Sequence, residues 1–249
     1  MVKIMFPNTY KFVDKIIKIT TIYHYFHLMA KDYLSSETYT IEIVNSLEEI
    51  KEALMRYKSR DEKENLNNLD YIESLLILEK LATLFNKDNT FIFHGSSFYI
   101  DDINNGFIIT AKSGVGKSTH ARLLKEYLNQ RFYYINDDKP FIHFDIDNYF
   151  YLYGSAWDGK EKKSSNVKAK LKGIFILYQN KTNEIKRITA DEAINYLFKQ
   201  IYIPESQITI VNTMHYIIAL AQNVPIYLLG CNISLEAAKL SYKTMEELM

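Results

Sequence analysis

The sequence has almost no cysteine. Cys231 is the single cysteine among 249 residues, which excludes an internal disulfide framework and is typical of a chain in a reducing compartment. We therefore expect a cytoplasmic protein. Because Cys231 ends an apolar run, burial is a better interpretation of this thiol than a role as a nucleophile.

Net charge and long hydrophobic runs are lacking too. The 30 basic residues balance the 30 acidic ones, which argues against nucleic-acid binding through bulk positive charge, so we expect no nucleic-acid partner. The best membrane candidate, HYIIALAQNVPIYLLG, is interrupted by Gln222, Asn223 and Pro225 and is too short to span a bilayer. Residues 1–9 show no signal peptide. We expect no membrane association.

What the chain does have is an alternation of strand-like and helix-like segments. Ser46 with Glu49 and Thr189 with Glu192 are capping-box patterns, and each predicts the start of a helix. Hydrophobic periodicity predicts further helices at about 70–86, 117–129, 207–222 and from 235. The pattern favours an α/β protein with a mixed sheet. We expect an N-terminal α+β portion at 1–70, not necessarily independent, and a nucleotide-binding catalytic domain at 71–249.

The strand FIITA is predicted to pair with the strand before it. NTFIFHGSSFYI is typical of a strand, and the turn residues DDINNG follow it, with Asn105-Gly106 as the usual hairpin signal. FIITA should therefore lie antiparallel to its predecessor. Ordinary doubly wound nucleotide-binding sheets reach the corresponding strand through a parallel crossover instead.

Residues 111–118, AKSGVGKS, form a motif that we call the glycine loop. It fits the phosphate-binding pattern small-x-x-x-x-Gly-Lys-Ser, with Ala111 where glycine is commoner. Main-chain N–H groups curled around Gly114 and Gly116 can converge on the phosphates of ATP. Lys117 can bind the β and γ oxygens, and Ser118 can bind Mg²⁺. The alternative is a Gly-Ser turn that caps an ordinary helix. The candidate nucleotide-binding residues are Ser113, Gly114, Val115, Gly116, Lys117, Ser118 and Thr119.

Two acids, Asp137 and Asp138, follow the strand RFYYIN, and we call them the acid pair. A motor-type ATPase usually shows Asp and then Glu at this place, whereas here Pro140 stops the strand just beyond two aspartates. Adjacent carboxylates at a phosphate site can divide the work, because one can hold Mg²⁺ while the other accepts a proton from an attacking hydroxyl. Phosphoryl transfer to an alcohol requires this division. The alternative is a polar turn, since NDDKP is good turn chemistry.

Three segments together resemble the HPr kinase-like proteins, a branch of the phosphoenolpyruvate carboxykinase-like fold: FHGSSFYIDDINNGFIITAKSGVGKSTHARL, INDDKP and YGSAWDGKE. The resemblance covers roughly residues 75–240. It implies an ATP- and Mg²⁺-dependent kinase that transfers the γ-phosphate to a hydroxyl, with His94 near the active site beside Lys117. It also implies that the acid pair carries the base and metal duties without saying which acid does which; our assignment is Asp137 as the base and Asp138, with Ser118, toward the metal. By itself, a strand histidine such as His94 is more often hydrogen-bonded in the core.

One segment departs from the family. HPr kinase/phosphorylases carry an Arg-Gly-Leu-Gly signature after their acid pair, whereas this chain has YLYGSAWDGK. The chain looks more like smaller relatives, some of which phosphorylate serine in peptides or small proteins. Trp157, Gly159 and Lys160 are therefore candidate substrate contacts. The alternative is a polar loop anchored by one aromatic residue.

Two other functions stay open. The acceptor could be a small-molecule alcohol such as a sugar or polyol instead of a peptide or small protein. The chain could also be a regulator that binds ATP without transferring phosphate. Members of the family often form homo-oligomers, although no interface signature is visible in the sequence.

Overall fold

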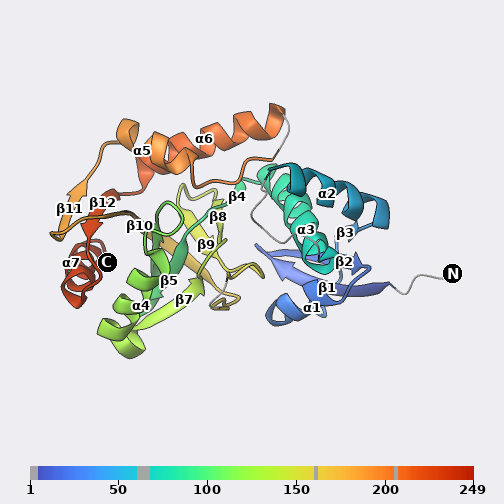
Figure 1. Cartoon of the computed structure of the whole chain (residues 1–249), viewed down its shortest axis with the longest axis horizontal. Coiled ribbons are helices and arrows are strands. Elements are labelled where there is room, and N and C mark those ends of the chain that lie inside the picture. Colours follow the sequence, from blue (N-terminus) through green and yellow to red (C-terminus); the bar gives the residue numbers. More distant parts are fainter. Residues whose placement is uncertain (1–4, 61–67, 160–161, 205–206) are drawn as a thin grey trace. The chain divides into compact units, whose positions relative to one another are not determined.

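The computed structural model describes residues 5–60, 68–159, 162–204 and 207–249 (Figure 1). Contacts divide the chain into two compact units, Met1–Leu84 and Phe85–Met249. One helix, α3 (Leu69–Asn86), contains both this division and the boundary expected at residue 70. Among the residues described, no helix is both long enough and apolar enough to cross a membrane.

The smaller unit combines a three-stranded sheet, in the order β1-β2-β3, with helices. β1 and β2 are antiparallel, whereas β2 and β3 are parallel. The predicted capping box at the start of α2 is confirmed: the Ser46 N–H donates to Glu49 Oε2 over 2.8 Å, and the Glu49 N–H donates to Ser46 Oγ over 3.1 Å. The elements before α3 are β1 (Phe6–Phe12), β2 (Lys15–Thr21), α1 (Tyr25–Met29), the 3₁₀ turn η1 (Lys31–Tyr33), β3 (Ile41–Val44) and α2 (Leu47–Arg60).

The larger unit is built on a nine-stranded mixed sheet, which confirms the predicted α/β class. Seven strands run in the order β4-β8-β9-β10-β6-β5-β7, and β12 pairs with β10 and β11. The strands are β4 (Thr90–Ile92), β5 (Ser96–Ile100), β6 (Asp102–Thr110), β7 (Phe132–Asn136), β8 (Phe141–Phe144), β9 (Phe150–Tyr153), β10 (Lys168–Gln179), β11 (Glu184–Arg187) and β12 (Ile226–Cys231). Its helices after α3 are α4 (Lys117–Leu128), the 3₁₀ turn η2 (Asn129–Arg131), α5 (Ala190–Phe198), α6 (Gln207–Asn223) and α7 (Leu235–Glu246).

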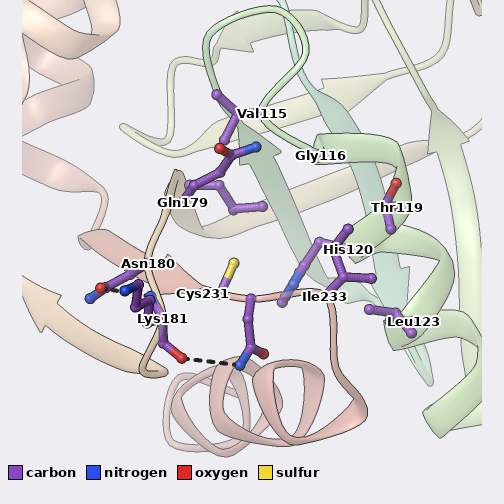
Figure 2. Close-up of a pocket in the computed structure, with 12 residues that line it drawn as sticks. Val115, Gly116, Thr119, His120, Leu123, Gln179, Asn180, Lys181, Cys231 and Ile233 are labelled. Carbon is purple, nitrogen blue, oxygen red and sulfur yellow. Dashed lines mark hydrogen bonds between the residues drawn. The ribbon is translucent and has the colours of Figure 1, made fainter.

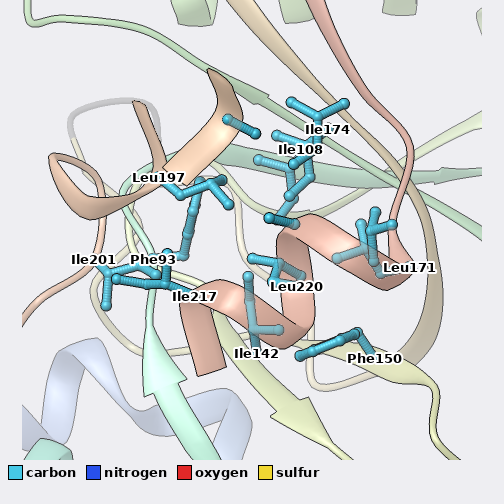
Figure 3. Packing of buried hydrophobic residues seen from close by; sticks show 14 of the residues in the cluster. Phe93, Ile108, Ile142, Phe150, Leu171, Ile174, Leu197, Ile201, Ile217 and Leu220 are labelled. Atoms are coloured by element: carbon cyan, nitrogen blue, oxygen red, sulfur yellow. The ribbon is translucent and has the colours of Figure 1, made fainter. Parts of the chain in front are cut away.

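Helices bury both faces of this sheet, because side chains alternate along its central strands. Ile108 on β6 and Ile174 on β10 belong to one core, which α5 and α6 cover with Leu197, Ile217 and Leu220 (Figure 3). Their neighbours along the two strands point to the other face, where α4 and α7 cover a second core. The central strands are therefore enclosed, and polar chemistry is left to the loops at their ends.

The predicted hairpin is confirmed, but the expected position of its turn is wrong. β5 and β6 are antiparallel, with Ile100 paired to Asp102, so the chain turns at Asp101 in a left-handed conformation (φ 60°). Asn105 and Gly106 lie inside β6. Gly106 is needed there for another reason: a Cβ at this position would lie 2.6 Å from the carbonyl oxygen of Lys170 on β10.

The segment expected as one strand, NTFIFHGSSFYI, is two strands separated at His94-Gly95. β4 pairs with β8, whereas β5 pairs with β6 and β7 in another part of the sheet. The break brings Gly95 so close to β6 that a Cβ there would meet Ile108 Cγ2 at 2.7 Å. The chain therefore changes its place in the sheet at a histidine that the sequence marks as a site candidate.

Candidate functional site

Three segments that carry candidate residues leave the sheet at one edge. β6 and β7 are both antiparallel to the strand between them, β5, so β6 and β7 run in the same direction. The glycine loop follows the end of β6, and the acid pair follows the end of β7. His94 precedes the start of β5, which lies at this same edge. The β5–β6 hairpin brings His94 to this edge, and the crossover through α4, which returns the chain parallel to β6 on the far side of β5, brings the acid pair there.

The glycine loop turns through two glycines that have open space around them. Gly114 and Gly116 adopt φ angles of +81° and +118°, a region that favours glycine, and an added Cβ would meet nothing within 4 Å at either. Gly116 is the N-cap of α4 and gives it no side-chain cap. The first N–H groups of α4 and its positive dipole end are thus available to an anion. Ser118 and Thr119 follow, half-buried, in the first turn.

Lys117 connects the glycine loop to the acid pair. Its Nζ donates to the main-chain carbonyl oxygen of Asp137 over 2.9 Å. Burial lowers the pKa of Lys117, and the nearby charges of Asp137 and Asp138 act in the opposite direction. The lysine is thus a partly desolvated cation held between the loop and the two acids.

The two acids have different surroundings. Asp138 is charge-paired with Lys139, whose Nζ lies 2.7 Å from Oδ2, and its Oδ1 lies 3.5 Å from His94 Nε2. Asp137 is only 4% exposed, and its Oδ1 has no hydrogen-bond partner among the described residues. A buried carboxylate oxygen without a donor is costly unless a ligand or proton satisfies it. The charge of Asp138 is thus neutralised by a partner, whereas one carboxylate oxygen of Asp137 lacks a hydrogen-bond donor.

His94 is held in place by main-chain and side-chain contacts. Its N–H donates to the carbonyl of Gln200, its Nδ1 lies 3.3 Å from Gln200 Oε1, and its carbonyl accepts from Thr110 Oγ1. The N–H of Gly95 donates to the carbonyl of Asp138. Burial, and then the charge of Lys117, lower the pKa of His94. The imidazole is therefore favoured in its neutral form beside the acid pair.

The segment that follows β9 provides another wall of the site. Gly159 has φ +70°, and a Cβ there would lie 3.0 Å from Asp138 Cβ, so this glycine packs directly against the acid. Trp157, expected as a substrate contact, is 3% exposed and packs inside the fold. This position is that of an anchoring aromatic residue, not of a ring presented to a substrate. Lys160, the third expected contact, lies outside the described residues.

Sequence reasoning missed two residues of this site. Asp158 is half-buried, and its pKa is raised mainly by burial, with the charges of Asp137 and Asp138 adding to the shift. Gln200 accepts from Thr110 Oγ1 over 3.0 Å and orients His94. The Asp-Gly pair next to Trp157 was a signal for Asp158. No local signal pointed to Gln200, because α5 brings it to the site from far along the chain.

The residues present fit a magnesium nucleotide. The open space over Gly114 and Gly116 can admit phosphate oxygens, and the Asp138 carboxylate and the Ser118 hydroxyl are hard oxygen donors of the kind that Mg²⁺ prefers. The unsatisfied Oδ1 of Asp137 is left to accept a proton. The described residues contain no group of three or more His, Cys, Asp or Glu that could hold a metal by themselves. Such a site suits Mg²⁺ bound partly through phosphate and water.

No family model and no curated protein matches this chain. Among solved structures it is similar to the Hpr(Ser) kinase/phosphatase from Coxiella burnetii, with a TM-score of 0.37 and 14% identity over 63% of this chain and 97% of that one. A score this low does not define a family, and the function proposed below is built from the side chains of this chain.

Proposed function

We propose that the protein is an ATP- and Mg²⁺-dependent kinase that transfers the γ-phosphate to a hydroxyl. One observation carries the proposal: Lys117, at the uncapped start of α4, is bonded to the main chain of the first acid of the pair. A phosphate on the glycine loop is thereby brought beside two carboxylates. Phosphoryl transfer is catalysed mainly by positioning and charge neutralisation, and this arrangement supplies both.

Each residue has a part in the proposed reaction. The glycine-loop N–H groups and Lys117 hold the β- and γ-phosphates. Ser118 and Asp138 would hold Mg²⁺, which when bound would supply charge neutralisation at the phosphate oxygens. Asp137 accepts the proton of the acceptor hydroxyl as the new O–P bond forms and the bond to the ADP oxygen breaks.

Neutral His94 leaves the site without an additional positive charge, and the lowered pKa of its imidazole supports this. Its ring faces the acid pair, with Nε2 3.5 Å from Asp138 Oδ1. Gln200 keeps the ring in this orientation through its contact with Nδ1. Gln200 is therefore a positioning residue.

We further propose that the fold is of the phosphoenolpyruvate carboxykinase-like type and that the acceptor is a serine of a peptide or small protein. The antiparallel strand before the glycine-loop strand supports the fold type, because ordinary doubly wound sheets lack it. The serine acceptor follows from the resemblance of the glycine loop, the acid pair and the GSAWDGKE segment to HPr kinase-like proteins.

The test is phosphate transfer by the full chain. The protein is incubated with Mg²⁺ and γ-labelled ATP together with a serine-containing peptide pool or a pool of sugars and polyols. The proposal is supported if the wild type labels the peptide and the Asp137→Asn variant does not. Label found only in the small-molecule pool overturns the peptide acceptor, and ATP binding without transfer to any pool overturns the kinase.

A further inference from the structure

A cavity of about 430 Å³ lies beside the glycine loop (Figure 2). One wall is the end of the loop and the start of α4, with Val115, Thr119 and Leu123. The other wall is formed where β10 and β12 end, at Gln179 and Ile233. β10 is parallel to both β6 and β12, so the carboxyl ends of all three strands reach this edge. Ligands of open α/β sheets bind in crevices of this kind.

We propose that this cavity binds the adenine and ribose of the nucleotide whose phosphates lie on the glycine loop. The inference rests on the proposed function and adds the place in this chain where the nucleoside of ATP binds. Gly116, Thr119, His120 and Leu123 line the cavity in the order in which they leave the loop. A nucleotide with its terminal phosphates at Lys117 would therefore reach these residues with its α-phosphate first, then its ribose and then its base.

The cavity favours adenine by shape and by polarity. Its volume is within the range of small-ligand sites, and the apolar side chains of Val115, Leu123 and Leu177 can enclose a flat base. The exposed amide of Gln179 makes no hydrogen bond within the described part of the chain. A side-chain amide matches the paired donor and acceptor of adenine. No carboxylate is among the described lining residues to accept the two donors of guanine.

His120 supplies an acceptor for a ribose hydroxyl. Ser241 Oγ donates to the carbonyl of Ala238 over 3.0 Å, so it accepts from His120 Nε2, which lies 2.9 Å away. Nδ1 of the neutral ring is therefore the atom with the lone pair. This atom is buried and has no hydrogen-bond partner among the described residues, while His120 itself is 2% exposed. A ribose O–H is the kind of donor that would satisfy it.

The wall opposite α4 is held in place before any ligand arrives. The Asn232 side-chain amide donates to the carbonyl of Lys181 over 3.2 Å, drawn as a dashed line in Figure 2. The main-chain N–H of Asn180 donates to the carbonyl of Cys231 over 3.1 Å. These bonds join the turns after β10 and β12, and a pre-organised wall reduces the entropy lost on binding.

The experiment compares MgATP with magnesium tripolyphosphate, which lacks the nucleoside, by calorimetry on the full chain. We expect ATP to bind at least about tenfold more tightly than tripolyphosphate. Ile233→Trp should fill the cavity and reduce ATP affinity to the tripolyphosphate level, with tripolyphosphate binding unchanged. Ile233 is 79% exposed, so the larger side chain should not disturb the fold. Ile146→Trp is the matched control, because Ile146 is 97% exposed and does not line the cavity.

Base identity is tested in the same assay. Gln179→Leu should weaken ATP but not tripolyphosphate, and GTP should bind the wild type at least about tenfold more weakly than ATP. Equal affinity for ATP and GTP overturns the adenine assignment, and equal affinity for ATP and tripolyphosphate overturns the nucleoside site. In both cases retained tripolyphosphate binding leaves the proposed function standing.

Cys231 gives a second readout that does not require the glycine loop. It is the only cysteine and it lines the cavity, so labelling by a maleimide reports on this site alone. We expect adenosine to slow the labelling in both the wild type and Lys117→Ala. Protection by adenosine in the lysine variant supports the cavity even if phosphate binding fails, whereas an unchanged labelling rate in both proteins overturns it.

Discussion

The ammonium group of Lys117 and the main-chain carbonyl of Asp137 are joined by a hydrogen bond of 2.9 Å. The bond links the first residue of α4 to the residue that follows β7. A lysine ammonium carries three N–H donors, so Lys117 can keep this bond and still donate to a bound phosphate. The contact would then hold that phosphate beside the acid pair.

Lys117→Ala should remove phosphate binding while the fold remains. A positioned cation in a partly desolvated site is worth far more than one in water, and kcat/KM should fall roughly 10²–10³-fold. Lys125→Ala is the control, since Lys125 is exposed on the same helix and contacts the Tyr134 ring. Steady-state transfer rates and the circular dichroism of both variants check this. Comparable loss in the two variants would contradict the assignment.

Substitutions of the two acids should have different effects on the kinetics. Asp137→Asn should abolish transfer and retain ATP binding, because the amide cannot accept the hydroxyl proton. Asp138→Asn should instead raise the Mg²⁺ concentration needed for half-maximal rate, since it removes a charged metal ligand. Rate measurements across a Mg²⁺ titration distinguish the two, and an exchange of these phenotypes would reverse the roles.

Gly159→Ala should disturb Asp138 in a way that Gly114→Ala does not. Both glycines have positive φ, so both substitutions should destabilise the fold by about 1–2 kcal/mol. Only at Gly159 does the new Cβ meet a neighbour, Asp138 Cβ at 3.0 Å. The Mg²⁺ dependence of the rate should therefore shift in Gly159→Ala, whereas Gly114→Ala, in the glycine loop, should mainly weaken ATP binding. Chemical denaturation measures the loss of unfolding free energy in both variants. An unshifted Mg²⁺ dependence in Gly159→Ala would show that Gly159 does not support Asp138.

Acid should destabilise the protein partly through His120. Burial lowers the pKa of His120 from 6.5 to about 4 in the folded chain. The unfolded chain thus binds this proton first, so stability is complete above pH 6.5 and is lost as the pH falls toward 4. His120→Gln should reduce the loss of unfolding free energy between pH 7 and pH 5 by about 2 kcal/mol.

The matched control for this titration is His215→Gln, because His215 is exposed on α6. Burial also lowers the pKa of His27 and His94, so these residues contribute in the same direction to every variant. The difference between wild type and His120→Gln isolates one histidine. An identical pH slope in the two proteins would mean that the buried ring is protonated as easily as a free one.

Local patterns predicted most of the elements because each depends on neighbouring residues. Both capping boxes lie where the sequence indicates them, and the helices near 70, 117 and 207 begin within about one residue of expectation. The strand alternation was enough to indicate a mixed sheet. The predictions failed where a distant strand decides the backbone. Gly106 has to be a glycine because β10 packs closely against it, and a local turn pattern carries no information about that contact.

The candidate site was predicted in part for the same reason. The glycine loop and the acid pair are short motifs, and their chemistry is visible in a few consecutive residues. Gln200 and the cavity beside α4 consist of residues from segments far apart in the chain, so only the sheet order brings them together. Trp157 shows the converse: a single tryptophan among lysines suggested a surface ring, yet it fills the interior.

The break at His94-Gly95 has a mechanical consequence. β4 belongs to the half of the sheet that contains β8 and β9, and β5 belongs to the half that contains β6 and β7. Only Phe93, His94 and Gly95 join these strands, and the last two contact Thr110 and Asp138 at the edge that carries the candidate site. If one half of the sheet twisted against the other, the strain would fall first on this short connection. The connection can thus transmit a distortion of the sheet to the carboxylates.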